Sequence, residues 1–339
     1  EEDYGKGGVG AIYFDAGGNV LSYKRLLDGT TDNCGGGKTP WGTFITLEEN
    51  KDHGTGIWEV DPWYERPPSL TALAERKPGM YESFAYDNRN PFNPNFFFTE
   101  DAEDGTLRKF SPNPSSISAD PKTMWRMLYD EGYRHEYLVL NPSTYTTTAD
   151  GTVKPTGGQF QWTDDIEEGR ASATQYYQFT EGIDCRDGML YFISKTQQEL
   201  FVLNLDYDTW TVSSTEHGAF SQPDQLYSIF PSQEKAPQDP NEDENIIYFT
   251  EDGGSEYSGL HARDMKGRYF TILESVTEII TQDETTGLAF SPDRRHIYFA
   301  LQKNGNVFDI WREDGHAFGG KHLDIKYHAS STNVNRRNW

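Results

Sequence analysis

The chain has 339 residues and a net charge of -24, with 54 acidic against 30 basic side chains. Such a surface repels nucleic acid and anionic lipid and attracts divalent cations, which argues against a polyanion-binding role. No apolar run approaches the ~18 residues that a membrane helix needs, so we expect no membrane span. Two cysteines, Cys34 and Cys185, are too few for a disulfide scaffold.

The start of the chain shows no signal peptide at Glu1. An acidic cytosolic protein would have this composition, and so would a mature secreted chain. We expect the second: a secreted, extracellular or periplasmic protein whose signal has been removed.

From the N-terminus onward, short aromatic and β-branched runs alternate with Asp, Asn, Gly and Pro clusters, a pattern that predicts hairpins. A first strand is predicted at 11–14. Helical periodicity is scarce, and the one weak helix prediction is Ser69 to Lys77, ended by Pro78.

Five pairs of runs share one order: an apolar run with a marker Phe, a polar turn and a second apolar run. They are GTFITLEEN with GTGIWEVD, NFFFTED with GTLRKFSP, MLYFISK with ELFVLNLD, IIYFTED with SGLHARD, and HIYFALQ with NVFDIWRED. The markers are Phe44, Phe98, Phe192, Phe249 and Phe299, and their spacings are 54, 94, 57 and 50 residues. The spacing of 94 is about two periods, so we expect a sixth, degenerate copy at 136–140 and 159–163, with a long loop at about 141–158.

A period near ~50 residues with four strands per repeat is typical of β-propeller blades. We therefore predict an all-β chain that forms a single domain over 1–339, a six-bladed β-propeller whose ring the strand at 11–14 helps to close. A pair of β-sandwiches is the alternative.

Each repeat has one metal-capable side chain upstream of its marker. These residues are Cys34, Glu82, Glu181, Asp224 and Glu284. Because the innermost strands of a propeller line its central channel, we expect these side chains to converge there on a metal site. An all-oxygen set suits calcium, whereas carboxylates with a thiolate suit iron. The competing interpretation is that they are ordinary turn residues.

Acid pairs also end three of the marker strands. Candidate ligands among them are Glu48, Glu49, Asp101, Glu251 and Asp252. Adjacent strand residues point to opposite faces, so at most one acid of each pair is expected to face the channel. A turn at Gly253–Gly254 is expected to let backbone carbonyls share a calcium ion.

The stretch NCGGGKTPWGTFITLEEN at 33–50 joins a thiol, a glycine run and paired carboxylates. We expect the glycines to let the backbone approach a ligand closely. This stretch resembles the signature of the PhoX-type alkaline phosphatases. GMYESFAYD, TEGIDCRDGMLYF, QPDQL, YFTEDGGSEYSGLHARDMKGRYFTIL and ETTGLAFSPDRRHIYF are similar to further segments of that family, in the same order.

The resemblance implies a calcium-dependent phosphomonoesterase on a six-bladed propeller, with an iron pair, several calcium ions and a phosphorylated small molecule as substrate. It places Cys34 and the four upstream acids among the metal ligands. Many relatives have Arg-Pro where this chain has Phe179 and Thr180, and that Arg is thought to hold phosphate. Lys38 is a weak substitute candidate for substrate binding.

Two classes of function stay open: a metal-dependent phosphoesterase, and a non-catalytic, calcium-stabilised extracellular propeller for adhesion or assembly. The histidines, including His53, His217, His261 and His316, show no paired metal spacing and are expected at the surface or in turns. Cys185 is expected to be a buried small hydrophobe.

Overall fold

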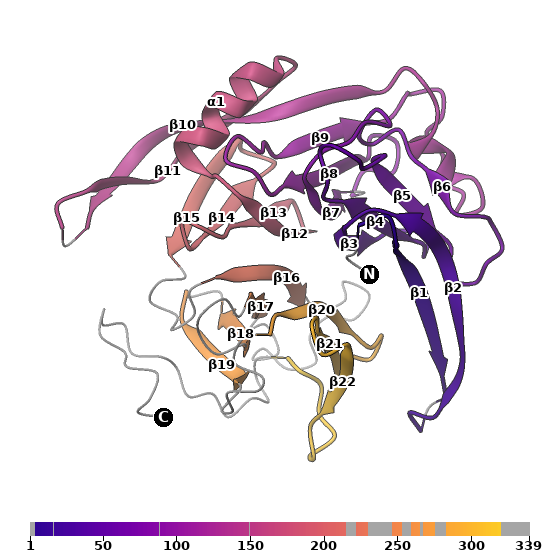
Figure 1. The fold of residues 1–339 in the computed structure, drawn as a ribbon. Coiled ribbons are helices and arrows are strands. Elements are labelled where there is room, and N and C mark those ends of the chain that lie inside the picture. Colours follow the sequence, from indigo (N-terminus) through magenta and orange to yellow (C-terminus); the bar gives the residue numbers. More distant parts are fainter. Residues whose placement is uncertain are drawn as a thin grey trace. The chain divides into compact units, whose positions relative to one another are not determined.

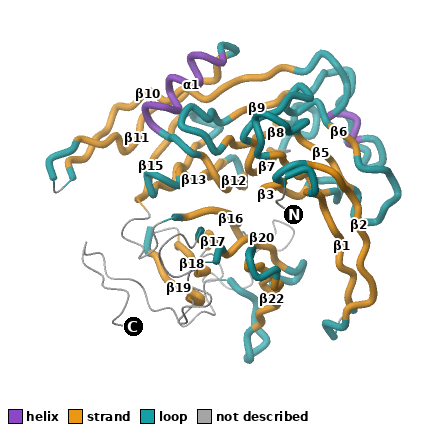
Figure 2. Tube along the Cα trace, in the orientation of Figure 1, coloured by secondary structure: helices purple, strands orange, loops and turns teal. Residues whose placement is uncertain are grey.

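The computed structural model describes residues 4–15, 17–87, 89–148, 150–214, 222–229, 246–252, 259–264, 267–274 and 283–319. The chain divides into two compact units. The first comprises 1–141 and 159–181, and the second comprises 142–158 and 182–339. Nearly all described secondary structure is β, as the strand tubes of Figure 2 show, which confirms the predicted all-β class.

The first unit begins with a separate two-stranded hairpin and then forms two groups of antiparallel strands. The hairpin is β1 (Gly7–Phe14) with β2 (Val20–Thr30). The first group is β3 (Asn33–Lys38), β4 (Phe44–Glu48), β5 (Ile57–Val60) and β6 (Ser69–Leu70); the second is β7 (Tyr81–Asp87), β8 (Asn95–Glu100), β9 (Arg108–Ser111) and β10 (Arg134–Thr147). In both groups, chain order is also the order in the sheet (Figure 1).

The second unit continues the same arrangement. Its groups are β12 (Thr180–Arg186), β13 (Met189–Ser194), β14 (Glu199–Asn204) and β15 (Thr209–Ser214); β16 (Pro223–Ile229), β17 (Ile246–Glu251), β18 (Gly259–Asp264) and β19 (Tyr269–Glu274); and β20 (Thr285–Phe290), β21 (His296–Leu301) and β22 (Asn306–Trp311). All five predicted hairpins are antiparallel pairs, so the repeat is confirmed.

Within each unit, consecutive groups pack on one another through apolar side chains. In the first unit, Ile45 and Leu47 of β4 share a core with Phe96 and Phe98 of β8. In the second unit, Tyr191 of β13 packs with Phe249 of β17. The packed faces consist of buried apolar side chains, as expected for sheets that stack.

The predicted sixth copy does not form a separate group among the described residues. Its two runs lie in β10 and in β11 (Val153–Thr163), and β10 pairs with β9. The predicted long loop at 141–158 is wrong, because these two strands extend through most of it. The turn between them contains Asp150 and Gly151, with Gly151 at φ +89°. The β-branched residues and the Asp-Gly pair were the missed signals.

Two smaller predictions also need correction. β1 pairs with β2 in a sheet of its own, so within the described residues the strand at 11–14 closes no ring. Ser69–Lys77 forms β6 and turns rather than a helix, and Glu75 and Arg76 have left-handed backbone, each at φ +54°. That conformation is incompatible with a right-handed helix.

The sequence did not predict the helix α1 (Ile166–Tyr176) or the 3-10 turn η1 (Met124–Leu128). The Asp165 side chain caps α1 by accepting a hydrogen bond from the Glu167 N–H. The buried face of α1 consists of the small residues Gly169, Ser172 and Ala173. The Leu140 N–H of β10 donates a hydrogen bond to Ser172 Oγ at 2.9 Å. Figure 1 shows α1 lying along β10. A face without large apolar residues gave no helical periodicity.

Candidate metal centre

The first strand of four groups contains a β-bulge. The pairing register breaks between Cys34 and Gly37 in β3, Tyr81 and Phe84 in β7, Pro223 and Leu226 in β16, and Thr286 and Ala289 in β20. A bulge inserts an extra residue and re-aims its side chain. Two of the predicted ligands, Glu82 and Asp224, lie inside these bulges, and Cys34 borders one. Glu284 lies immediately before β20.

The glycine run allows β3 to lie directly on the backbone of β7. A Cβ atom on Gly35 would come within 2.0 Å of the Glu82 carbonyl oxygen, and one on Gly37 within 2.2 Å of the Phe84 carbonyl oxygen. Real Cβ atoms do not approach backbone so closely, so only glycine fits here. The close neighbour of these glycines is therefore β7, whereas the sequence predicted a ligand.

This close approach brings three predicted ligands together. One ligand atom each from Cys34, Glu49 and Glu82 lies within 4.8 Å of the others. Glu82 is buried, and Cys34 and Glu49 are half-buried. The Glu49 N–H donates to the Asp32 carbonyl at 2.9 Å, and Glu49 forms an isolated bridge with Met80. Both cysteines are thiols. A thiol with two carboxylates is a donor set that suits iron.

The acid before Glu49 has a different environment. Glu48 is buried, and its carboxylate accepts hydrogen bonds from the N–H groups of Thr31 at 2.8 Å, Thr55 at 2.7 Å and Gly56 at 3.0 Å, and from the Trp58 indole at 3.2 Å. These donors stabilise the charge without a cation. We therefore leave Glu48 out of the ligand set that we propose below.

The equivalent acids in two other repeats have instead a basic partner in the next strand. Glu100 is 2.5 Å from the buried Arg108 guanidinium, and Glu251 is 3.0 Å from the ring of His261. His261 is fully buried, so its predicted surface or turn position is wrong. His217 and the predicted Gly253–Gly254 turn lie outside the described residues.

Asp101 and Asp252 follow their strands at the position of Glu49. The Asp101 N–H donates to the Met80 carbonyl at 2.8 Å, and the Asp252 N–H donates to the Gln222 carbonyl at 2.9 Å. The backbone of all three acids is thus fixed beside the entry to a bulged strand.

The second unit has its own group of acids. Asp224 is buried, and its Oδ2 atom has no hydrogen-bond partner among the described residues. Burial raises the pKa of Asp224, while Lys195 and the adjacent Glu284 side chain oppose that shift. The other oxygen, Oδ1, accepts from Gln225 Nε2 at 3.3 Å. A buried carboxyl with one oxygen unsatisfied is costly as an anion, which favours uptake of a proton or a cation.

The remaining predicted residues lie in different elements and have different partners. Glu181 is buried at the start of β12, where its carbonyl oxygen accepts from Thr99 Oγ1 at 2.6 Å. Lys38 is exposed at the end of β3. Phe179 has left-handed backbone at φ +53°, and its N–H donates to the Ala102 carbonyl at 2.9 Å. Cys185 is buried in β12, as predicted.

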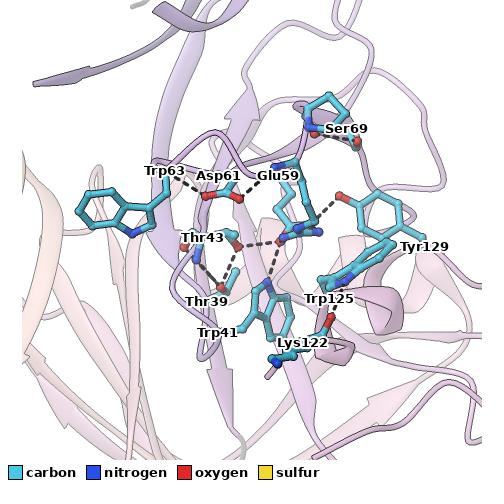
Figure 3. Close-up of polar contacts among 12 residues, drawn as sticks. Thr39, Trp41, Thr43, Glu59, Asp61, Trp63, Ser69, Lys122, Trp125 and Tyr129 are labelled. Carbon is cyan, nitrogen blue, oxygen red and sulfur yellow. Dashed lines mark hydrogen bonds and ion pairs between the residues drawn. The ribbon is translucent and has the colours of Figure 1, made fainter. Parts of the chain in front are cut away.

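Sequence reasoning missed a second buried carboxylate beside the signature, Glu59 of β5. It accepts hydrogen bonds from Trp41 Nε1 at 2.6 Å, Thr43 Oγ1 at 2.7 Å and Tyr129 OH at 2.6 Å, and these side chains converge on it in Figure 3. The Arg66 guanidinium is 2.7 Å away and also lies over the Trp125 ring. This Glu59 network neutralises its carboxylate entirely with protein groups.

The strand groups and the thiol-carboxylate cluster define an all-β protein with a candidate metal centre. The family model described as alkaline phosphatase PhoX matches residues 19–69, which confirms the PhoX resemblance over the segment that contains Cys34, Glu48 and Glu49. A comparison with curated proteins found no match. Among the described residues, no helix has both the length and the apolar character needed to cross a membrane.

Solved structures show the same fold. Pseudomonas fluorescens PhoX, in a complex with vanadate, is similar with a TM-score of 0.61 and 16% identity, over 88% of this chain and 72% of that chain. A nidogen/laminin complex is similar with a TM-score of 0.51 and 11% identity, over 93% of this chain and 90% of that chain. At these identities the likeness concerns the fold alone.

Proposed function

We propose that this protein is a metal-dependent phosphoesterase that hydrolyses phosphomonoesters of small molecules. The observation that carries this proposal is the cluster of Cys34, Glu49 and Glu82, whose ligand atoms lie within 4.8 Å of one another. The cluster lies at a bulge, inside and beside the segment that matches an alkaline phosphatase family. Bulges are frequent beside active sites.

The donor types suggest which ions bind. Iron is the proposed ion at the first cluster, because a Cys34 thiolate is a soft ligand beside two carboxylates. Calcium is the proposed ion at the oxygen-only acids of the second unit, Asp224, Asp252 and Glu284. Ligation by Asp101, Glu181 and Glu251 remains a prediction. When bound, such ions polarise the phosphoryl oxygens and lower the pKa of water.

The protein groups hold the ions and orient the substrate. Glu82 is held by its place in β7, and Glu49 is held by the hydrogen bond from its N–H to the Asp32 carbonyl. Both ligands are therefore in place before an ion binds. Lys38 stays a weak candidate for contact with the substrate anion. Phe179 has no positive charge, so we expect weaker phosphate binding than in relatives with Arg.

Two further features belong to this proposal. The strand groups are proposed to be propeller blades around a central channel, and the count of six stays a prediction. Secretion to the periplasm or the extracellular space is likewise expected from the PhoX resemblance. The family match, together with the vanadate that the P. fluorescens structure contains as a transition-state analogue, favours the phosphoesterase over the non-catalytic calcium-stabilised propeller.

The test is metal analysis of protein purified without chelators, combined with hydrolysis of a chromogenic aryl phosphate. We expect iron and calcium, and activity that chelation removes. Cys34→Ala should abolish iron binding and hydrolysis while calcium persists, whereas Cys185→Ala should change neither. Phe179→Arg should lower the KM. Iron-loaded and calcium-loaded protein that hydrolyses nothing, with or without Phe179→Arg, would favour the scaffold function.

A further inference from the structure

The third repeat differs from its neighbours at the end of the marker strand. Where β4, β8 and β17 are followed by the acids Glu49, Asp101 and Asp252, β13 is followed by Lys195. The residue before it changes as well, from Glu to Ser194. The formal charge of this pair is therefore +1 in the third repeat and -2 in the first, second and fourth, while the fifth repeat has the neutral pair Leu301–Gln302.

Lys195 lies beside the acids of the next group. Its Nζ atom is 3.7 Å from Asp252 Oδ2, and the two side chains are 21% and 34% exposed. Its charge also acts on the buried Asp224, which in turn is adjacent to Glu284. The apolar packing of Tyr191 and Ile193 of β13 against Leu226 of β16 holds the two strands together and fixes this arrangement.

The net charge of these four side chains determines how strongly they can bind a divalent cation. Asp224, Asp252 and Glu284 together contribute -3, and Lys195 brings the sum to -2, which one divalent cation neutralises. Without the ammonium group, three carboxylates would remain, one of them with an oxygen that is buried and has no hydrogen-bond donor among the described residues. Neighbouring like charges that lack a counter-charge raise the affinity for cations.

We propose that Lys195 is a built-in cation that offsets one of the three negative charges of Asp224, Asp252 and Glu284 and thereby limits these acids to one weakly held divalent ion. The ammonium group repels an incoming calcium ion and makes the electrostatic potential at the three carboxylates less negative. This inference rests on the metal dependence in the proposed function and not on hydrolysis.

The experiment is calcium titration by calorimetry, with stoichiometry from native mass spectrometry, on the whole chain. Lys195→Met should bind calcium about tenfold more tightly or take up an additional ion, because a repulsive charge is removed. Lys195→Arg should behave as the wild type, since it keeps the charge. Lys122→Met removes the same charge from an exposed site in the first unit and is the matched control. In an Asp224→Asn background, Lys195→Met should have a much smaller effect.

The outcomes separate the two proposals. Equal or weaker calcium binding by Lys195→Met, beside a wild type that binds calcium, overturns the role of Lys195 and leaves the metal-dependent function intact. Calcium binding by Lys195→Met but not by the wild type supports the role of Lys195 and argues against calcium in the native function. If neither protein binds calcium, both proposals fail.

Discussion

Two buried carboxylates of the first unit have different neighbours. Glu59 is surrounded by donors, namely an indole, a hydroxyl, a phenol and a guanidinium. Glu82 lies instead beside Cys34 and Glu49, two further groups that become anionic. A carboxylate with donors stabilises the fold by itself, whereas carboxylates and a thiol that converge need an external cation. We therefore expect Glu59 to act as a structural acid and Glu82 to act as a metal ligand.

The largest expected effect tests the structural acid. Glu59→Gln removes the charge and places an amide N–H₂ against existing donors, so we expect a loss of about 3–5 kcal/mol in the free energy of unfolding. Denaturant unfolding should show the same loss with metal and with chelator, because no ion is involved. A loss that appears only in metal-loaded protein would mean that Glu59 belongs to the metal site.

Glu82, the proposed metal ligand, should respond in the opposite way. Saturating metal that binds only the folded state stabilises it by about 4 kcal/mol at a thousand times the dissociation constant. Glu82→Gln should lose much of this stabilisation in metal-loaded protein. In chelator the variant should equal or exceed the wild type in stability, since one of several converging acids is gone. A large loss in chelator would make Glu82 a structural acid like Glu59.

Much of this contrast could not be read from the sequence. The hairpins were predictable, because apolar alternation and turn residues are local signals. The bulges were not, since they depend on how two strands pair, and they decide where Glu82 and Asp224 point. The alternation rule placed at most one acid of each strand-end pair in the channel, and it did not reveal the donors around Glu48, which come from Thr31 and Thr55 in separate turns.

The repeat itself contained one signal that was overlooked. Aligning the ends of the marker strands places Lys195 opposite Glu49, Asp101 and Asp252, and that exchange is visible without a structure. The role of Glu59 was not visible, because Tyr129 reaches it from a segment 70 residues away. Contacts of that kind follow from packing between loops, which local patterns do not determine.

A further prediction concerns a half-buried histidine of the first unit, His135. Burial, reinforced by the nearby Arg108, lowers the pKa of His135 to about 4 from 6.5. The unfolded chain takes up this proton near pH 6.5 and the folded chain only near pH 4. Protonation of His135 therefore leaves the free energy of unfolding unchanged above pH 6.5 and lowers it progressively as the pH falls from 6.5 toward 4. His135→Leu should flatten this part of the stability profile by about 2–3 kcal/mol.

The measurement for His135 is the free energy of unfolding from pH 7 to pH 4 in chelator, which keeps metal release out of the comparison. His53, an exposed histidine, provides the control: His53→Leu should retain the wild-type profile. An equal acid sensitivity of wild type and His135→Leu would show that carboxylates alone cause it.

The smallest expected change in stability tests the close approach of β3 to β7, which brings the proposed ligands Cys34 and Glu82 together. In Gly35→Ala, the new Cβ would lie 2.0 Å from the Glu82 carbonyl oxygen, so β3 must move away from β7. Such overpacking costs about 1–3 kcal/mol. Because Cys34 is the next residue and Glu82 lies on the opposing strand, the same movement should separate two proposed ligands, and metal affinity should fall more than stability alone explains. Gly319→Ala is the matched control, since its Cβ would meet nothing within 4 Å. Unchanged metal affinity in a folded Gly35→Ala variant would mean that the approach of β3 to β7 serves packing and not the metal centre.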